Sequence, residues 1–429
     1  PMSGSPLRVL SEKLRVVKQA LRTWSKTEFG DIFVAVRQAE KAVMEAEEDY
    51  DHHPPAAKWV GLQEARARLR NNLTIGEGFW KQKARVKWAV EGDKNSKYFH
   101  DIVAEKRRKA IIHRIRKANG EWVDSEGQIG CEAVSFFQDL FTAEASVQPQ
   151  DFLRVIPRLV SEQDNLMLTE APTLHEVKEV IFSMDGESAA GPDGFTGKFF
   201  TFAWEVVAAD VYAGVVSFFC GAELPRGVAA TSIVLIPKVQ CPQDFSQFRP
   251  ISLCNFINKI ISKVLADRLA RILPQIISPQ QSGFVQGRLI SDSFLLAQEL
   301  VTDMKRGNRG GNVILKLDMM KAYDRVSWPF LLQVMRRFGF SETWIDMIWR
   351  LISNVWFSVI VNGLPQGFFK ATRGLRQGDP ISPALFVIGA EVLSRALNEL
   401  PGRRNFNPFK VPVGCPTITH LAYADDVIV

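Results

Sequence analysis

Apolar residues recur at helical spacing through the first fifty positions of the chain. Leu7, Leu10 and Leu14 open a heptad pattern that continues to Tyr50. Alternating steps of three and four residues place such side chains along one seam of a long helix. The segment at 52–55, His-His-Pro-Pro, breaks the pattern, and a second helical stretch follows it. The simplest architecture is an antiparallel helical hairpin whose seam packs within the chain.

Shorter elements are predicted between residues 111 and 185. Residues 111–123 contain Asn119-Gly120 and predict a β-hairpin on a type I′ turn. Residues 131–185 have the pattern of helices that are separated by prolines. Thr173, with Glu176 three positions later, marks the capped start of an amphipathic helix.

Two β-branched runs follow and predict a pair of strands at 232–238 and 248–253. Residues 255–273 then form a strongly amphipathic pattern, and we expect Pro274 to end that helix. A Gly- and Pro-rich loop precedes a further apolar helix at 384–397.

Composition is that of an ordinary globular protein, with 46% hydrophobic and 23% charged residues in 429 positions. This length has room for two or three domains. The sequence shows no apolar run long enough to span a membrane and no signal-peptide pattern. Its five cysteines form no Cys-x-x-Cys pair, which argues against a zinc site and favours reduced thiols in an intracellular protein.

Charge is distributed unevenly around the net value of +6. Residues 1–120 hold 25 Lys/Arg and 15 Asp/Glu, a net charge of +10, so the remainder carries −4. Between residues 81 and 117 there are 13 basic and four acidic residues with interleaved aromatics. Such a segment suits contact with nucleic-acid phosphates and bases, although solvated charged helices would look similar. The sharpest basic run is Lys106, Arg107, Arg108 and Lys109, which also resembles a nuclear localisation signal.

Carboxylates follow two apolar runs. Residues 312–318 read as a buried strand that ends in Asp318, and residues 418–429 read as a strand, a tight turn at Asp425-Asp426 and a second strand. Adjacent aspartates with apolar flanks repel each other and lose hydration, and a divalent metal would compensate. Alone, the pair would more often be an ordinary hairpin turn. With Asp318 it supplies the hard oxygen ligands of a two-metal phosphoryl-transfer site.

Eight short motifs succeed one another from residue 91 to residue 426. They are EGDKNSKYFH (91–100), GPDGF (191–195), LIPK (235–238), FRPISL (248–253), QSGFVQGR (281–288), DMMKAYD (318–324), GLRQGDPISP (374–383) and YADD (423–426). In this order they resemble the reverse transcriptase of a LINE-type (non-LTR) retrotransposon, of the kind abundant in plants. The resemblance covers the chain from about residue 80 to its end.

The resemblance implies an α+β fold, with the fingers and part of the palm of a reverse transcriptase preceded by a helical hairpin. An antiparallel palm sheet would be backed by helices. We expect a helical extension at 1–80, a basic linker that contacts nucleic acid at 81–170, and fingers with an incomplete palm at 171–429. In the family a thumb follows, and the sequence stops three residues after Asp426. It therefore has the appearance of a fragment or a partial copy of a mobile element.

The resemblance also implies roles for individual residues. Asp318, Asp425 and Asp426 would be catalytic and would bind two Mg²⁺ ions, with Mn²⁺ as an alternative. Nucleotide contacts would come from the cations and polar groups Lys238, Arg249, Tyr323, Gln377 and Gly378, and Tyr323 would also exclude a 2′-hydroxyl. Nucleic-acid contacts would come from Gly191, Asp193, Arg288 and the basic run Lys106, Arg107, Arg108 and Lys109.

The implied partners are template RNA, a DNA primer or target DNA, and dNTPs, in the nucleus and cytoplasm. No membrane is implied and no oligomeric state is predicted. The implied reaction is RNA-directed DNA synthesis. A non-catalytic nucleic-acid-binding remnant is the alternative from another class. A group II intron maturase shares the carboxylate pattern, but the motifs at 91–100 and 191–195 favour the LINE type. An ATPase is disfavoured because the sequence has no P-loop motif.

Overall fold

The computed structural model describes residues 4–52, 56–84, 96–142, 150–303, 313–404, 406 and 417–429. Backbone proximity divides the chain into two compact units, one of residues 1–11 with 113–429 and one of residues 12–112. This division falls at other positions than the domain boundaries expected at 80 and 170, which stay predictions. None of the described helices is both long and apolar enough to span a membrane.

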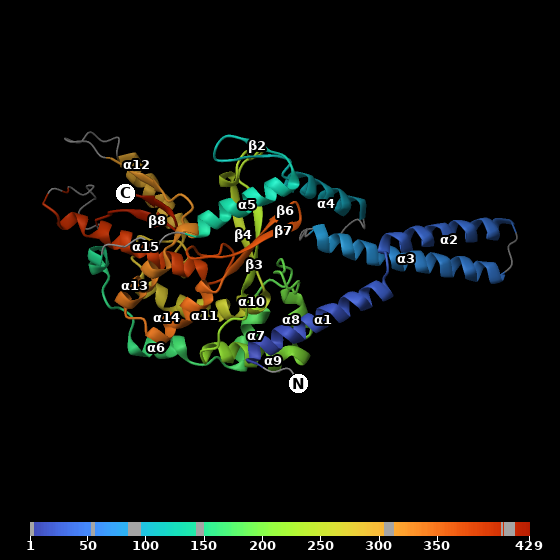
Figure 1. The fold of residues 1–429 in the computed structure, drawn as a ribbon, viewed down its shortest axis with the longest axis horizontal. Coiled ribbons are helices and arrows are strands. Elements are labelled where there is room, and N and C mark those ends of the chain that lie inside the picture. Colours follow the sequence, from blue (N-terminus) through green and yellow to red (C-terminus); the bar gives the residue numbers. More distant parts are fainter. Residues whose placement is uncertain are drawn as a thin grey trace. The chain divides into compact units, whose positions relative to one another are not determined.

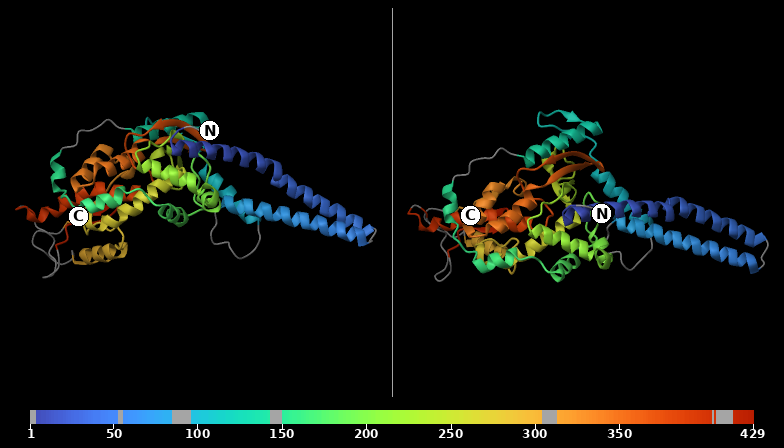
Figure 2. Two further views of the ribbon diagram at one scale, coloured as in Figure 1. Left: turned by 90° about the horizontal axis from the view of Figure 1, so that it is seen from below. Right: turned by 60° about the horizontal axis from the view of Figure 1, so that its bottom comes forward.

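The unit of residues 12–112 is helical. Its α2 (Ile32–His52) and α3 (Ala56–Ala84) lie side by side and antiparallel, as Figure 1 and Figure 2 show. Asp49 pairs with Lys58 at 2.6 Å (Oδ1 to Nζ), and Asn72 Nδ2 donates to the carbonyl of Ala35. This ion pair and this hydrogen bond join α2 to α3 in the antiparallel arrangement. The unit also contains α4 (Ser96–Ala110) and most of α1 (Pro6–Glu28).

The heptad seam is buried only in part. Ala39 and Val43 of α2 are buried, but Leu21 and Trp24 of α1 are 43% and 53% exposed. Leu7, Leu10 and Leu14 of α1 are buried, so the expectation that the whole seam packs within the chain is wrong only for the later part of α1. The physical reason is that α2 packs along α3, which leaves the later α1 seam residues exposed.

The larger unit contains a four-stranded sheet in the order β4-β3-β6-β7. Its strands are β3 (Ala230–Pro237), β4 (Phe248–Cys254), β6 (Trp356–Val361) and β7 (Leu364–Lys370). The predicted pairing of β3 with β4 is confirmed, and it is antiparallel. However, β3 and β6 are parallel, so this four-stranded sheet is mixed. More than a hundred residues separate β3 and β6, which leaves room for the helical crossover that parallel strands require.

Two Asn-Gly pairs in this unit form turns of different types. The hairpin of β1 (Ile115–Arg116) and β2 (Trp122–Val123) is confirmed. Its turn is not the predicted type I′, because Gly120 has φ of +88° while Asn119 does not have a positive φ. The Asn362-Gly363 turn between β6 and β7 has φ of +50° and +86° and does follow the type I′ pattern. Sequence reasoning missed this second hairpin turn.

A three-stranded antiparallel sheet in the order β5-β9-β8 contains the carboxylate motifs. Its strands are β5 (Lys316–Asp318), β8 (Leu421–Tyr423) and β9 (Asp426–Ile428). The strand-turn-strand prediction at 418–429 is confirmed. The prediction of a buried strand before Asp318 is wrong, because all three residues of β5 are exposed. Val313 and Leu315 beside β5 are 75% and 55% exposed and line an open cavity of about 370 Å³.

Helices surround these sheets in the larger unit. They are α5 (Glu126–Phe141), α6 (Glu162–Thr169), α7 (Leu174–Ser183), α8 (Gly197–Phe202), α9 (Trp204–Phe219), α10 (Arg226–Ala229), α11 (Phe256–Ile276), α12 (Ile290–Asp303), α13 (Trp328–Phe338), α14 (Glu342–Ser353) and α15 (Ser382–Asn398). Helix α5 packs on β6 and β7, and α15 packs on α11 and α13 (Figure 1). The resulting mixture of helices with small sheets agrees with the predicted α+β class.

Helix α11 forms the centre of the core. Thirteen of its 21 residues are buried, and it contacts α6, α7, α9 and α15. Each fully buried Leu or Ile side chain contributes roughly 1.5–3 kcal/mol. Pro274 does not end this helix as predicted, since the helix continues to Ile276. A proline in the last turn removes one helical hydrogen bond, and Arg395 donates to the carbonyl of Ile276 just beyond it.

Arginine side chains close the carbonyl ends of several helices in this unit. Arg268 donates to the carbonyls of Leu168 and Glu170 and pairs with Glu176. The Thr173 side chain caps α7 as predicted, by accepting from the backbone N–H of Glu176. The Glu176 carboxylate pairs with Arg268. Arg350 donates in the same way to the carbonyl of Phe218 in the last turn of α9 and to that of Ala222 just beyond the helix. Guanidinium groups suit these positions because helix C-termini carry unpaired carbonyls and partial negative charge.

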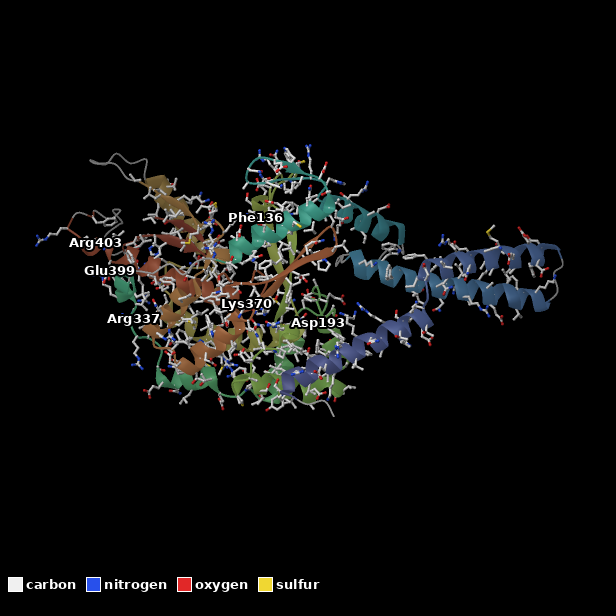
Figure 3. All side chains as sticks on the ribbon, in the orientation of Figure 1. Phe136, Asp193, Arg337, Lys370, Glu399 and Arg403 are labelled. Atoms are coloured by element: carbon white, nitrogen blue, oxygen red, sulfur yellow. The ribbon has the colours of Figure 1, made fainter. Side chains whose placement is uncertain are left out.

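The turn at 191–195 packs against the junction of β4 and α11. A Cβ atom on Gly191 would lie 2.5 Å from the backbone nitrogen of Asn255. Asn255 Oδ1 accepts from the backbone N–H of Asp193, which Figure 3 labels, and Asp193 Oδ1 accepts from that of Phe195. These contacts give Gly191 and Asp193 a structural role, and their predicted contact with nucleic acid stays a prediction.

Gly191→Ala is expected to lower the free energy of unfolding by about 2–3 kcal/mol, because a backbone-to-backbone clash must be relieved. Gly127→Ala in α5 is the matched control. Its new methyl group meets nothing within 4 Å, so helix propensity should leave stability unchanged or raise it. Denaturant unfolding of both variants measures the difference. Equal stabilities for the two variants would contradict this description of the turn.

Candidate active site

Three side chains lie in a row across the three-stranded sheet. Asp318 of β5 is directly opposite Asp426 of β9, which is directly opposite Tyr423 of β8. Directly opposed residues of antiparallel strands project from the same face of a sheet. The fold thus brings Asp318 and Asp426, 108 positions apart in the sequence, to neighbouring strands on one face. Asp425 lies beside Asp426 in the turn that joins β8 to β9.

This turn has a strained backbone. Ala424 has φ of +54°, a left-handed conformation that disfavours side chains with a Cβ by roughly 1–2 kcal/mol. Asp425 has no positive φ, so the two central residues match the pattern of a type II′ turn, in which glycine normally holds the first position. Ala424 is also buried. Residues in such conformations persist where the surroundings over-determine them.

Gln281 is the side chain that holds the turn. Its Oε1 accepts from the backbone N–H of Ala424 at 2.8 Å, and its Nε2 donates to the carbonyl of Ala424 at 3.2 Å. Gln281 is 4% exposed, so these bonds are shielded from water. Each contributes on the order of 1 kcal/mol, and together they are of the same size as the strain they oppose. The 281–288 segment, expected to contact template, thus contacts the back of the carboxylate turn.

The neighbours of Gln281 tighten this contact. The backbone of Ser282 donates to the carbonyl of Ala422, and the backbone of Ala422 donates to that of Gln280. A Cβ on Gly283 would lie 2.5 Å from the nitrogen of Ala424. Only a glycine permits so close an approach of the two backbones.

Arg288 anchors the other end of this segment. Its guanidinium donates to the carbonyls of Pro274, Ile277, Ser278 and Gln281 at 2.6–3.3 Å. Three of these acceptors lie in the last turn of α11 or within two residues of its end, so Arg288 fixes the segment to the end of the central helix. The contacts favour a positioning role, and the predicted contact of Arg288 with nucleic acid stays a prediction.

The far side of the turn region is closed by buried polar groups. His420 is 2% exposed, its Nε2 lies 2.6 Å from Ser394 Oγ of α15, and its Nδ1 lies 2.9 Å from Thr419 Oγ1. Burial lowers the pKa of His420 to about 4. The ring is therefore neutral near pH 7, and we interpret this buried pair as structural support for β8.

Tyr323 faces the same turn from another element. It begins the short helix η3 (Tyr323–Arg325), and its ring stacks on Phe386 of α15 with centroids 4.6 Å apart. Burial raises the pKa of Tyr323, and the negative charges of Asp425 and Tyr423 raise it further. The hydroxyl therefore stays protonated beside Asp425. The predicted contact of Tyr323 with the incoming nucleotide stays a prediction.

Gln377 lies beside Asp324 and not in open solvent. Its Nε2 donates to Asp324 Oδ1 at 2.8 Å, and its carbonyl accepts from the backbone of Ser252. Asp324 is 2% exposed, and burial raises its pKa to about 6, although the Gln377 bond and nearby cations lower it. The adjacent Gly378 has φ of +102°, which lets the loop turn at this point. The nucleotide contacts of Gln377 and Gly378 stay predictions.

Lys238 and Arg249 lie near the same end of the β3–β4 hairpin, because Pro237 pairs with Phe248. Lys238 Nζ donates to the carbonyl of Ser246, and its charge contributes to lowering the pKa values of both Lys321 and Asp324. Lys238 thus lies close enough to Lys321 and Asp324, at η3, for its charge to act on both. Arg249 is exposed on β4.

Lys321 joins that neighbourhood with an unusual backbone, since its φ is +56°. Its Nζ lies 4.2 Å from the ring centroid of Phe136 on α5, a residue labelled in Figure 3. Sequence reasoning did not single out Lys321. The only signal for it was its position inside the 318–324 motif.

The basic run at 106–109 belongs to the other unit. Lys106, Arg108 and Lys109 are exposed on α4, and Lys109 pairs with Glu105 at 2.6 Å. The side chain of Arg107 lies outside the described residues, as do residues 91–95 of the first motif. Exposure agrees with a role in binding phosphates, which stays a prediction.

Whether a metal ion fits this site depends on how the carboxylates are arranged. Within the described residues, no group of three or more His, Cys, Asp or Glu side chains is gathered closely enough to hold an ion. Asp426 instead has Lys316 Nζ 3.8 Å from its Oδ1. The donor chemistry nevertheless fits Mg²⁺, since two carboxylates are opposed on one face and a third is adjacent in the turn.

Known proteins resemble parts of this chain. The sequence model of the reverse transcriptase (RNA-dependent DNA polymerase) family matches residues 236–429. The uncharacterized 149 kDa protein of transposon TX1 from Xenopus laevis is 26% identical over 349 residues, 81% of this chain. The Pol polyprotein of the type-2 retrotransposable element R2DM from Drosophila melanogaster is 28% identical over 247 residues, 56% of this chain. The chain spans 26% and 22% of the lengths of these two relatives.

Gln281→Leu is expected to lower the free energy of unfolding by about 2–4 kcal/mol, because it leaves the buried N–H of Ala424 without an acceptor. Adding Ala424→Gly should recover about 1 kcal/mol, because glycine tolerates the left-handed conformation. Gln286→Leu, at an exposed position of the same segment, is the matched control and should change stability by less than about 0.5 kcal/mol. Denaturant unfolding measures all three. Equal effects of the two leucine substitutions on stability would contradict the conclusion that Gln281 holds the turn.

Proposed function

By family this chain is a reverse transcriptase of the LINE (non-LTR) type, and on that premise we propose that it forms the fingers and part of the palm of an RNA-directed DNA polymerase. The observation that carries the proposal is the opposition of Asp318 and Asp426 on neighbouring strands, with Asp425 in the adjoining turn. Carboxylates that share one face of a small sheet repel each other, and a divalent cation between them would offset that repulsion.

The proposed reaction joins a primer to a deoxynucleotide. The primer 3′-hydroxyl attacks the α-phosphate of a dNTP, and the bond between that phosphate and the leaving pyrophosphate breaks. An RNA template selects the nucleotide by base pairing. The proposed partners are therefore template RNA, a DNA primer or target DNA, and dNTPs.

Asp318, Asp425 and Asp426 are the residues that would hold the two Mg²⁺ ions. When bound, these ions would lower the pKa of the attacking hydroxyl and neutralise charge on the leaving group. The strained turn orients Asp425 and Asp426 in advance, so little reorganisation would be needed. Lys316 would release Asp426 from a weak, exposed ion pair, whose disruption costs less than about 1 kcal/mol.

Residues around η3 would hold the nucleotide. Tyr323 is fixed by its stack on Phe386 and presents a protonated hydroxyl beside Asp425, a position suited to meeting the sugar of the incoming nucleotide. Lys238 and Arg249 would bind the triphosphate, the first as a point charge and the second as a bidentate fork. Gln377 and Gly378, whose loop is hydrogen-bonded to β4, would contact the nucleotide from that side.

Nucleic-acid binding without synthesis is the second candidate function. The observation that favours it is the basic run on α4, where Lys106, Arg108 and Lys109 are exposed. This function predicts binding that weakens steeply with salt and does not depend on Asp425.

Asp425→Ala is expected to abolish single-nucleotide incorporation, by at least about a hundredfold, without unfolding the chain. The measurement is primer extension on a DNA-primed RNA template with Mg²⁺ and dNTPs. Glu299→Ala removes an exposed carboxylate on α12 and is the matched control, which should retain the activity of the unsubstituted chain.

The two functions give different results in this experiment. Incorporation that requires Asp425 but not Glu299 supports the polymerase. RNA binding with no incorporation by any variant supports the binding function. Incorporation that survives Asp425→Ala would overturn the assignment of the carboxylates.

A further inference from the structure

Helix α1 has an exposed apolar side in its later half. Val16 and Trp24 are 54% and 53% exposed, and Ala20 between them is exposed as well. At the start of the same helix, Leu7 and Leu10 are buried and face Gly214 of α9. The run of apolar side chains thus continues past the part that is packed, and among the described residues its later half is left open.

An open hollow lies along this later half. Four helix residues at positions i, i+3, i+4 and i+7 form the hole that receives one side chain of a facing helix. Two such holes overlap on α1, one at 16, 19, 20 and 23 and one at 20, 23, 24 and 27. Because Ala20 is small and belongs to both, the floor of the hollow is low. Among the described residues the hollow is lined by Val16, Gln19, Ala20, Thr23, Trp24, Thr27 and Glu28.

The polar groups in the hollow can be covered at little cost. The hydroxyls of Thr23 and Thr27 donate to the carbonyls of Gln19 and Thr23, so covering them leaves no donor unsatisfied.

The positive charge of α1 lies away from the hollow. Four cations recur at steps of three and four residues on the other side of the helix: Arg15, Lys18, Arg22 and Lys26. Nucleic-acid phosphates would be bound by that basic side. The nearly uncharged, hollowed side instead suits another helix.

We propose that the hollowed side of α1 is an interface between two copies of this chain, in which the two α1 helices pack antiparallel. The side is complementary to itself, because it has both a large side chain, Trp24, and a hole around the small Ala20. A two-fold axis places Trp24 of one copy in the hole around Ala20 of the other, and the reverse contact follows by symmetry. The four cations of each helix then point outward and do not face each other.

Opposite charges at the two ends of this side favour the antiparallel direction. Lys13 lies one turn before Val16, and Glu28 ends the helix. Antiparallel packing brings Lys13 of one copy within reach of Glu28 of the other, at both ends of the contact. Parallel packing would place like charges together. A contact through one helix of each copy is small, so we expect a weak dimer with a dissociation constant on the order of 10 µM.

Sedimentation velocity of the full chain, from about 1 to 100 µM, measures the dimer. Ala20→Arg fills the hole and puts a charge into it, while arginine keeps a high helix propensity at this exposed position. We expect its dissociation constant to rise at least about tenfold. Met44→Arg is the matched control, because Met44 is 62% exposed on α2 in the same unit. It should dimerise as the unsubstituted chain does, and circular dichroism should show unchanged helix in both variants.

A charge exchange tests the antiparallel direction without relying on loss of binding alone. Glu28→Lys places two lysines together at each end, so the dimer should weaken about threefold. Adding Lys13→Glu recreates the two opposite-charge pairs with their members exchanged, and the dimer should recover. A double variant weaker than Glu28→Lys would contradict the antiparallel arrangement.

Three further outcomes would overturn the proposal. The first is a chain that stays monomeric throughout the concentration range. The second is a dimer that Ala20→Arg and Met44→Arg affect equally. The third is a monomeric chain whose binding to single-stranded RNA or to anionic vesicles is impaired by Ala20→Arg, since this side would then have another partner. All of these readouts are independent of polymerase activity.

Discussion

The left-handed backbone of Ala424 is the constraint on which the site depends. It lets β8 return as β9 within two residues, and this return places Asp426 opposite Asp318. The strain of roughly 1–2 kcal/mol is opposed by the two hydrogen bonds from Gln281, each on the order of 1 kcal/mol. The balance is close, so the turn persists only because several groups act together.

Those groups connect the turn to the core. Gln281 belongs to a segment that Arg288 fixes to the carbonyl end of α11, the most buried helix of the larger unit. The same use of arginine recurs at the ends of α6 and α9. At the ends of α6, α9 and α11 an arginine side chain therefore connects the packed core to a loop, and the segment that holds the carboxylate turn is one of those loops.

Local sequence patterns predicted the helices and strands better than the tertiary contacts between them. The strands around Asp425, the β3–β4 hairpin and the cap at Thr173 follow from periodicity and capping chemistry. The role of Gln281 could not be predicted, because its partner is 143 residues away. Nor could the two Asn-Gly turns be told apart, since local sequence does not reveal whether strand pairing will impose positive φ on both residues. The exposure of β5 could not be predicted either, because the local sequence does not show whether another element will pack on a strand.

We propose that residues 281–284, 318–323 and 423–426 surround one metal-binding site. Fe²⁺ in exchange for Mg²⁺, with ascorbate and peroxide, cleaves the backbone only near the bound ion, and mass spectrometry locates the cuts. We predict cuts in all three segments, suppressed by excess Mg²⁺ and lost in Asp425→Ala. Cuts in one segment alone, or cuts scattered along the chain and insensitive to Mg²⁺, would contradict the account.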